Sequence, residues 1–358
     1  MHPTTNESSK RIFGFDIIRS SAIIIVVLAH SNYLIRGLSN YFPNFNPPDG
    51  VDLFFVLSGF LIGNIIIRSF EKNQKIELPA ILHFLKRRWF RTLPNYFLFL
   101  GINIAFIYFG LIAGTLNKYL STYFVFFQNF LKPYDFLFWE SWSITIEEWF
   151  YLLFPLTLFI VYKLNVFKKK QYVFLFTIVC FILLPLIIRI IKADANLNTD
   201  LFFRKLVITR LDAIGYGLLG AYLSYYFETA WMSYKNLLFV LGLISIFIIQ
   251  NIVVENTFYH QTFIFSLSAF SILLTFPKMA SIKEEKIPLK PFQFISKISY
   301  SLYFVHPIVL QLINKYYTND VINAKLWLYL PFWLICIICS FIIYKFFEKP
   351  FMNLRDKI

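Results

Sequence analysis

The sequence predicts an all-α fold, a polytopic transmembrane bundle of about ten helices. Of its 358 residues, 58% are hydrophobic and only 15% are charged, and the mean hydropathy is +0.61. A water-soluble globular chain carries roughly 25% charged residues, so this chain has too little polar surface for a soluble fold. A spanning helix needs about 20 mostly apolar residues. Ten segments meet this need: residues 14–35, 51–69, 94–113, 142–162, 172–191, 207–227, 235–254, 259–276, 296–316 and 326–347.

The spans follow one another without a polar linker, so we expect one integral-membrane domain over residues 1–358. The chain ends about ten residues after its last predicted helix, and we therefore expect no soluble C-terminal domain. Between the third and fourth spans, residues 115–141 are rich in aromatic side chains. Aromatic residues collect at membrane–water interfaces, so this segment is predicted to be a loop with a short interfacial helix.

The positive charges predict the orientation of the bundle. The net charge is +14, but most charges lie between apolar segments rather than in one basic patch, so nucleic-acid binding is not expected. Roughly two thirds of the 34 lysines and arginines fall in loops on the same side as the N-terminus. Cytoplasmic loops carry the excess of Lys and Arg. Both termini are therefore predicted to be cytoplasmic.

Ionisable side chains inside spanning segments are costly and mark candidate functional sites. The first predicted helix contains Asp16, Arg19 and His30. Asp16 and Arg19 are one turn apart, and a structural pair between them is the simpler interpretation. At 1.5 Å per residue, His30 lies roughly 16 Å beyond Arg19, which places it in the outer half of the membrane.

Other ionisable residues gather at two levels. Toward the outer side are Asp49, Asp52, Glu147, Arg210 and Asp212, and His306 lies midway along the ninth span. Arg88 and Arg91 lie at the inner edge and would share a helical face, where guanidinium groups bind phosphate in a bidentate manner. The simpler interpretation of these two arginines is charge that orients the bundle. A polar outer pocket and an anion-binding inner site would allow a reaction between substrates from opposite sides of the membrane. The same arrangement would also suit a transporter.

Several motifs follow one another along the chain. They are Arg19-x10-His30, GVDLFFVLSGFLI (50–62), Arg88-x-x-Arg91 with Pro94, WSITIEEWFYLLFP (142–155), RLDAIGYG (210–217), ISYSLYFVHP (298–307) and EKP (348–350). In this order they make the sequence similar to the acyltransferase 3 family, polytopic bacterial proteins that O-acylate surface glycans. There are two departures from the family pattern. Asp16-Ile-Ile-Arg19 replaces Asp-Gly-x-Arg, and Pro307 directly follows His306, where many members have His-x-Pro.

The resemblance implies a membrane-bound O-acyltransferase of the bacterial cytoplasmic (inner) membrane. The acyl group, expected to be acetyl, would come from cytoplasmic acyl-CoA, which acts as a substrate rather than a permanently bound cofactor. The acceptor would be a sugar hydroxyl of a cell-surface polysaccharide or of the lipopolysaccharide O-antigen. The expected partners are thus the lipid bilayer, acyl-CoA and the glycan, without nucleic acid or metal. The oligomeric state stays open.

The same resemblance gives roles to the candidate residues. We expect His30 to remove the proton of the acceptor hydroxyl, with Asp52 or Glu147 orienting its ring. Alternatively, His30 itself takes the acyl group and passes it outward. Arg88 and Arg91 would bind the phosphates of CoA. The remaining candidates for substrate or donor binding are Asp16, Arg19, Trp142, Ser143, Arg210, Asp212 and His306.

Two other functions use the same charges differently. A secondary transporter or glycan exporter would use the buried charges as a conduction path, but the sequence lacks the matching pair of broken helices typical of such proteins. A purely structural membrane protein would need no buried histidine or carboxylate. An acyltransferase is therefore the predicted function, with a transporter as the alternative.

Overall fold

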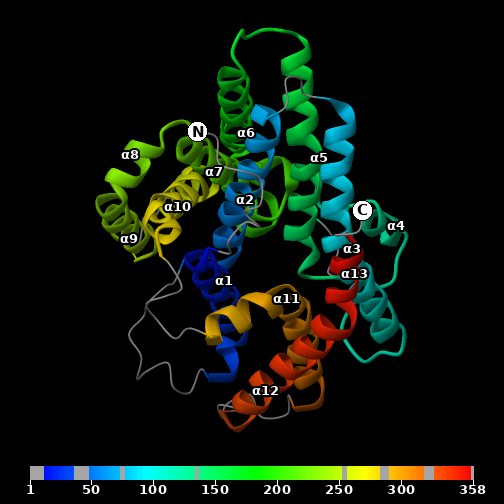
Figure 1. Ribbon diagram of the computed structural model, residues 1–358. Helices are drawn as coiled ribbons and strands as arrows, with labels where there is room; N and C mark the ends of the chain where they lie inside the picture. Colours follow the sequence, from blue (N-terminus) through cyan, green and yellow to red (C-terminus); the bar gives the residue numbers. More distant parts are fainter. Residues whose placement is uncertain are drawn as a thin grey trace.

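In the computed structural model, the described part of the chain forms a bundle of helices and contains no strand (Figure 1). The described residues are 12–35, 48–72, 77–133, 137–251, 256–282, 290–317 and 326–355. The two chain ends, whose cytoplasmic location the sequence predicts, lie outside these residues.

Ten long helices overlap the ten predicted spans. They are α1 (Phe13–Ser31), α2 (Gly50–Lys72), α3 (Leu78–Tyr108), α5 (Ser141–Lys163), α6 (Lys170–Lys192), α7 (Val207–Tyr226), α9 (Lys235–Asn251), α10 (Thr257–Ala280), α11 (Lys290–Tyr317) and α12 (Leu326–Ile343). The shorter elements are α4 (Leu120–Phe124), the π-helix η2 (Asp200–Arg204), α8 (Glu228–Ser233), the π-helix η4 (Tyr344–Glu348) and α13 (Lys349–Arg355). The five-residue α4 is the short helix predicted within residues 115–141.

Seven of the described helices are long and apolar enough to cross a membrane. They are α1, α2, α3, α5, α6, α10 and the continuous segment Trp327–Arg355, which contains most of α12 and the whole of η4 and α13. Helix α9 is apolar but has only 17 residues. Helices α7 and α11 bury polar side chains, Arg210 and Asp212 in α7 and His306 in α11, which lower their hydropathy. The prediction of a polytopic transmembrane bundle is confirmed, and the chain is a multi-pass membrane protein.

One predicted boundary is wrong. The third span was predicted to begin at Pro94, whereas α3 begins at Leu78 and carries Pro94 inside it. The cationic run from Lys86 to Arg91 therefore lies inside this helix. The residues from Arg88 to Tyr108 extend about 30 Å at 1.5 Å per residue, which equals the thickness of the hydrocarbon core. The segment from Arg88 to Tyr108 is therefore long enough to cross that core.

Helices α2 and α7 make the most extensive contact in the bundle. A Cβ atom built on Gly59 would lie 2.0 Å from the carbonyl oxygen of Ile214, and one on Gly217 would lie 2.1 Å from the carbonyl oxygen of Val56. The two backbones therefore touch, which only glycine allows. Gly59 and Gly63 have the GxxxG spacing that favours such close helix packing in membranes.

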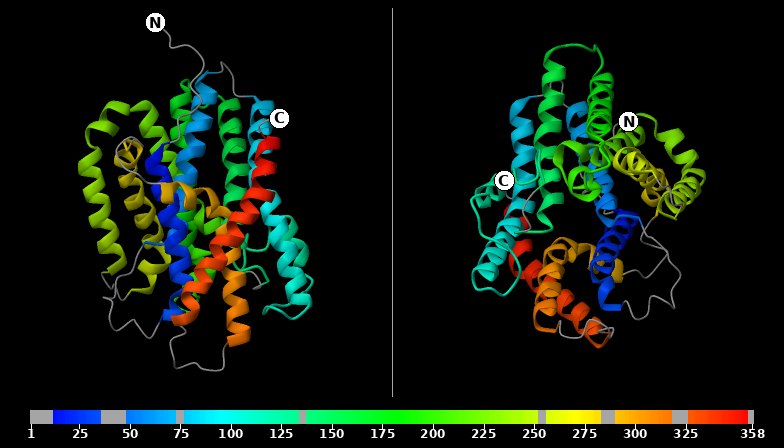
Figure 2. Two further views of the ribbon diagram at one scale, coloured as in Figure 1. Left: turned by 60° about the horizontal axis from the view of Figure 1, so that its bottom comes forward. Right: turned by 180° about the vertical axis from the view of Figure 1, so that it is seen from behind.

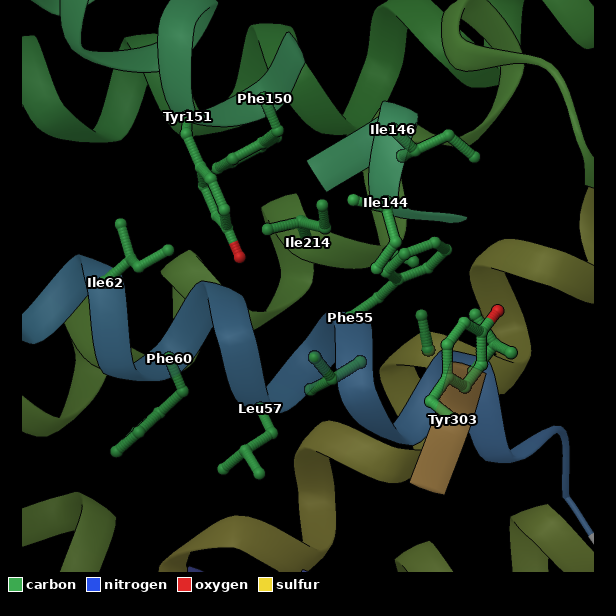
Figure 3. Close-up of a cluster of buried hydrophobic side chains, with 14 of the residues drawn as sticks. Phe55, Leu57, Phe60, Ile62, Ile144, Ile146, Phe150, Tyr151, Ile214 and Tyr303 are labelled. Atoms are coloured by element: carbon green, nitrogen blue, oxygen red, sulfur yellow. The ribbon is translucent and has the colours of Figure 1, made fainter. Parts of the chain in front are cut away.

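The hydrophobic core surrounds this crossing. Phe55 and Phe60 of α2, Ile144 and Phe150 of α5, and Ile214 of α7 belong to one buried cluster (Figure 3). Helices α8, α9 and α10 form one flank of the bundle, and α3, α4 and α13 form another (Figures 1 and 2). In α9 the one residue found buried is Gly242, so this helix lies at the periphery.

The close crossing makes a direct prediction. Replacing Gly59 with alanine should force α2 and α7 apart, because a Cβ atom meets backbone that has no rotamer to adopt. Overpacking costs about 1–3 kcal/mol, which predicts an apparent Tm lower by at least about 2 °C in detergent. Gly101→Ala is the matched control, since no atom lies within 4 Å of a Cβ built on Gly101 in α3. Equal Tm values for the two variants would contradict the proposed backbone contact.

Candidate active site

Three cavities follow one another through the bundle, and neighbouring cavities share lining residues. We name them from the sidedness that the lysine and arginine distribution predicts. The inner cavity has a volume of about 380 Å³, the central cavity about 100 Å³ and the outer cavity about 500 Å³. Arg88 and Arg91 line both the inner and the central cavity, and Val51 lines both the central and the outer cavity.

The inner cavity is strongly cationic. It lies between the second half of α2 and the first turns of α3, and Pro155 of α5 and Arg355 of α13 complete it. Its described lining contains His83 and the arginines at positions 87, 88, 91 and 355, and it contains no carboxylate. A cavity lined by several guanidinium groups is a site for a polyanion, most simply one that carries phosphates.

A hydrogen-bonded group fixes Arg88 where the inner cavity meets the central one. Its Nη2 donates to the hydroxyl of Tyr151 at 2.9 Å, and its guanidinium lies 4.6 Å from the centre of the Tyr151 ring. The Tyr151 hydroxyl is in turn 2.7 Å from Oγ of Ser58. Figure 3 shows Tyr151 pointing from α5 toward α2. Glu147 lies beside this group, so the carboxylate and guanidinium face the same cavity.

The central cavity is narrow, with polar groups at both ends. At its other end, Oγ of Ser143 is 2.7 Å from the hydroxyl of Tyr303. The lining also contains the apolar side chains of Phe54, Phe55, Leu57, Leu61 and Ile144. Its volume of about 100 Å³ lies below the roughly 300–1,000 Å³ typical of small-molecule sites. Such a space accepts a thin chain but not a sugar ring.

His30 and His306 lie against each other at the outer end of the bundle. Nδ1 of His30 is 2.9 Å from Nε2 of His306, and Nδ1 of His306 is 2.9 Å from the carbonyl oxygen of Leu302. The two rings are stacked, with centroids 5.2 Å apart. His306 is fully buried in α11, whereas His30, in the last turn of α1, lines the outer cavity. The structure thus brings together two candidate residues that are 276 positions apart in the chain.

The expectation that Asp52 or Glu147 orients His30 is wrong. Asp52 accepts a hydrogen bond from the guanidinium of Arg210 on α7. Glu147 lies beside Arg88 and Tyr151 in the central cavity. The physical reason is that a buried carboxylate needs a cationic or hydrogen-bonding partner. In each case an arginine supplies it, so neither carboxylate is left for His30.

Asp52 belongs to a buried ion-pair network that connects α2, α6 and α7. Arg210 pairs with Asp52 and lies 3.9 Å from Asp212, and Arg189 donates to Asp212 at 2.8 Å. Arg189 also donates to the carbonyl oxygens of Thr209 and Thr262. None of the four charged residues lines any of the three cavities. Their placement therefore supports a structural role for Arg210 and Asp212 rather than the predicted substrate binding.

Arg189 itself was missed at the sequence level. It is not among the candidate residues predicted from the sequence, whereas the structure places it in the last turn of α6 with its side chain completely buried. The signal that could have identified it is its position inside an apolar run, LLPLIIRIIK (183–192). A charge within such a run needs a partner in the bundle.

The other predicted residues fall in different places. Arg19 and Ser143 line the central cavity together with Arg88, Arg91 and Glu147. Asp16 is buried on α1 and accepts a hydrogen bond from Ser296 of α11 at 2.7 Å, away from the cavity lining. Trp142 is buried and lines none of the three cavities, and the guanidinium of Arg204 lies 4.9 Å from the centre of its ring.

An ion-pair cluster borders the outer cavity. Arg204 of η2 pairs with Asp49 at 2.6 Å and with Asp200 at 2.9 Å, and both Arg204 and Asp49 line the cavity. Burial alone would raise the pKa of Asp49, but the Arg204 guanidinium more than offsets this and lowers it. Burial would lower the pKa of Arg204, but the two aspartates raise it instead. All three groups are therefore charged near neutral pH. The sequence signal for Arg204 is its i,i+4 spacing from Asp200.

The structural role of Asp52 and Arg210 can be tested by a double-mutant comparison. Removing one partner of a buried ion pair costs about 3–5 kcal/mol, because it leaves an uncompensated charge. Asp52→Leu should therefore strongly reduce the Tm in detergent, and the double variant Asp52→Leu/Arg210→Leu should recover more than half of that loss. Asp49→Asn is the control, because its half-buried pair should contribute at most about 1 kcal/mol. A double variant no more stable than Asp52→Leu would argue against a stabilising role for this ion pair between α2 and α7.

Comparison with known proteins agrees with the motifs. Residues 12–345 match the acyltransferase domain family. The O-acetyltransferases OatA of Staphylococcus aureus strains NCTC 8325 and MRSA252 are each 29% identical to the chain over 370 residues, covering 96% of this chain and 57% of the relative. The chain thus spans a little over half the length of these relatives. No solved structure matches the chain. The family match covers nearly the whole chain, which therefore belongs to the acyltransferase family that its ordered motifs predicted.

Proposed function

We propose that this protein is a membrane-bound O-acyltransferase that transfers an acyl group, expected to be acetyl, from cytoplasmic acyl-CoA to a sugar hydroxyl of a bacterial surface glycan. The observation that carries the proposal is the series of three cavities, cationic at one end and containing His30 at the other. Family membership and the name of the S. aureus relatives, O-acetyltransferase, support the chemistry. The positive charge of the loops supports a location in the cytoplasmic membrane with both termini inside.

The inner cavity suits the phosphate-bearing end of acyl-CoA. Its volume of about 380 Å³ falls in the range of roughly 300–1,000 Å³ typical of ligand sites. Nε of Arg88 is buried and has no hydrogen-bond partner among the described residues, so it is available to an anionic ligand. Arg91, which lines the same two cavities, would be the second contact of a phosphate clamp.

The narrow central cavity favours acyl transfer over glycan export. The nucleotide end of acyl-CoA is bulky, but its thioester end is a thin flexible chain. A chain of that width suits a cavity of about 100 Å³, and a sugar does not. The donor would therefore bind from the inner side with its thioester in the central cavity. The acceptor would stay in the outer cavity, which has a volume of about 500 Å³.

His30 would supply the base for the reaction. A neutral imidazole nitrogen of His30 takes the proton of the acceptor hydroxyl while the oxygen attacks the thioester carbonyl carbon. The tetrahedral intermediate then collapses, the C–S bond breaks, and the proton passes from His30 to the leaving sulfur. The products are the O-acyl ester and CoA with a free thiol. Transfer through an acyl-His30 intermediate uses the same residue, and mass spectrometry of quenched protein would detect such an adduct.

Changing Arg91 to alanine tests the donor site. A hydrogen bond to a charged group contributes about 1.5–3 kcal/mol, so CoA affinity should fall roughly 10- to 150-fold in isothermal titration with detergent-solubilised protein. Lys86→Ala is the matched control, because it removes one positive charge from the same helix at an exposed position outside the inner cavity. Unchanged CoA affinity in a folded Arg91→Ala variant would remove this residue from the clamp.

Changing His30 to glutamine tests the base. Glutamine keeps a polar side chain of similar reach but cannot accept a proton near neutral pH. General-base catalysis contributes roughly 10²–10⁴-fold, so acyl transfer should fall by at least about that factor, measured as O-acetylation of the glycan in cells that carry the variant. Thermal stabilisation of the purified variant by CoA should be retained, because His30 does not line the inner cavity. Near wild-type acetylation by His30→Gln would show that His30 is not the base.

A further inference from the structure

We propose that His306 is a positioning residue that fixes the tautomer of His30, so that the Nε2 lone pair of His30 is available to the acceptor hydroxyl. This inference rests on the proposed function, in which His30 is the base. It assigns His306 a task different from that of a second base or a substrate ligand. The observations that carry it are the two hydrogen bonds of 2.9 Å that connect Leu302, His306 and His30 in series.

The backbone carbonyl at the buried end of this series sets the direction of both bonds. A carbonyl oxygen only accepts hydrogen bonds, so Nδ1 of His306 must carry the proton that bonds to Leu302. A neutral imidazole has one N–H, which leaves Nε2 of His306 as an acceptor. Nδ1 of His30, 2.9 Å away, must then be the donor. The remaining nitrogen of His30, Nε2, consequently carries a lone pair, which is what a base requires.

The surroundings of His306 favour its neutral form. Its side chain is completely buried, and its ring is hydrogen-bonded to the carbonyl of Leu302 and the His30 imidazole rather than to a carboxylate. An unpaired charge in such a place would be costly. In serine proteases an aspartate fixes the tautomer of the catalytic histidine. Here a neutral histidine would do so without placing a further negative charge inside the membrane.

Pro307 changes the backbone hydrogen bonding next to His306. Proline has no N–H, so Pro307 cannot donate the helical bond that the carbonyl of Tyr303 would otherwise accept. The carbonyls of Leu302 and Tyr303 are consecutive along α11, and Nδ1 of His306 donates to that of Leu302. The direct His306–Pro307 sequence, a departure from His-x-Pro, thus leaves a second backbone acceptor next to the one that orients the ring.

Two substitutions at position 306 separate positioning from other roles. His306→Gln keeps an amide oxygen that can accept from Nδ1 of His30 and an NH₂ group that can donate to the carbonyl of Leu302. His306→Leu fills space but makes neither bond. The assay is hydrolysis of acetyl-CoA in proteoliposomes, followed as release of the CoA thiol, with water as the acceptor. It yields kcat and the KM for acetyl-CoA separately.

The expected result is a divergence between the two variants. His306→Leu should lose at least about 10²-fold in kcat, because an unfixed His30 populates the wrong tautomer, while its KM stays near that of the wild type. His306→Gln should stay within about tenfold of the wild-type kcat. Equal loss in both variants would mean that His306 itself transfers the proton, and equal retention would mean that it only packs. Either outcome overturns the proposal.

A measurement on the unaltered protein tests the inference even if a variant fails to fold. Solid-state NMR of the protein with ¹⁵N-labelled histidine rings distinguishes protonated from unprotonated ring nitrogens. His30 and His306 should both show a protonated Nδ1 and an unprotonated Nε2, and a protonated Nε2 on His30 would overturn the proposal. This measurement needs no activity. A wild-type protein that neither binds nor hydrolyses acetyl-CoA would therefore count against the proposed function alone.

Discussion

The backbone contact between α2 and α7 determines where the polar groups of this bundle lie. At Gly59 and Gly217 the two helices touch without side chains between them, so neither can rotate or slide without the other. This fixed crossing aims the first turn of α2 at α7, where Asp52 meets Arg210. Other positions on α2, including Ser58, face the central cavity. Along α2, this backbone contact thus separates two regions. One is the buried ion-pair network of Asp52, Arg210, Asp212 and Arg189, which we call the charged seam, and the other is the central cavity.

The ionisable residues inside the membrane accordingly belong to two groups. In the α2–α7–α6 network, carboxylates and guanidinium groups alternate and neutralise each other, and the seam presents no net charge to a ligand. In the inner and central cavities the arginines outnumber the carboxylates, and Arg88 is held by a tyrosine hydroxyl and ring. A positive excess with fixed geometry attracts an anion. The imbalance, rather than the presence of charge, distinguishes the cavity from the seam.

Much of the fold could be predicted from the sequence, because an apolar run of about 20 residues has few alternatives to a membrane-spanning helix. The start of α3 could not, because Pro94 and the cations before it are typical of a loop, whereas the helix continues through both. Of the candidate site, the separation of His30 from Arg88 and Arg91 could be predicted from the helical rise, and the three residues line opposite ends of the series of cavities. The sequence could not give the partner of His30, since His306 lies 276 residues away and meets it only through packing. For the same reason the sequence could not separate Asp52, which is in the seam, from Glu147, which is in the cavity.

The pairing of Asp52 with Arg210 also has a consequence for biosynthesis. The two residues are 158 positions apart in the chain, and ribosomes add roughly 5–20 residues per second. The carboxylate on α2 is therefore made roughly 10–30 s before its guanidinium partner exists. Until α7 has been synthesised, Asp52 has no guanidinium partner. The first turn of α2 therefore needs to stay near the lipid headgroups, where water can solvate the carboxylate. Consequently, the helices cannot pack in the order in which they are synthesised. The ion pair between α2 and α7 forms only after α7 has been inserted.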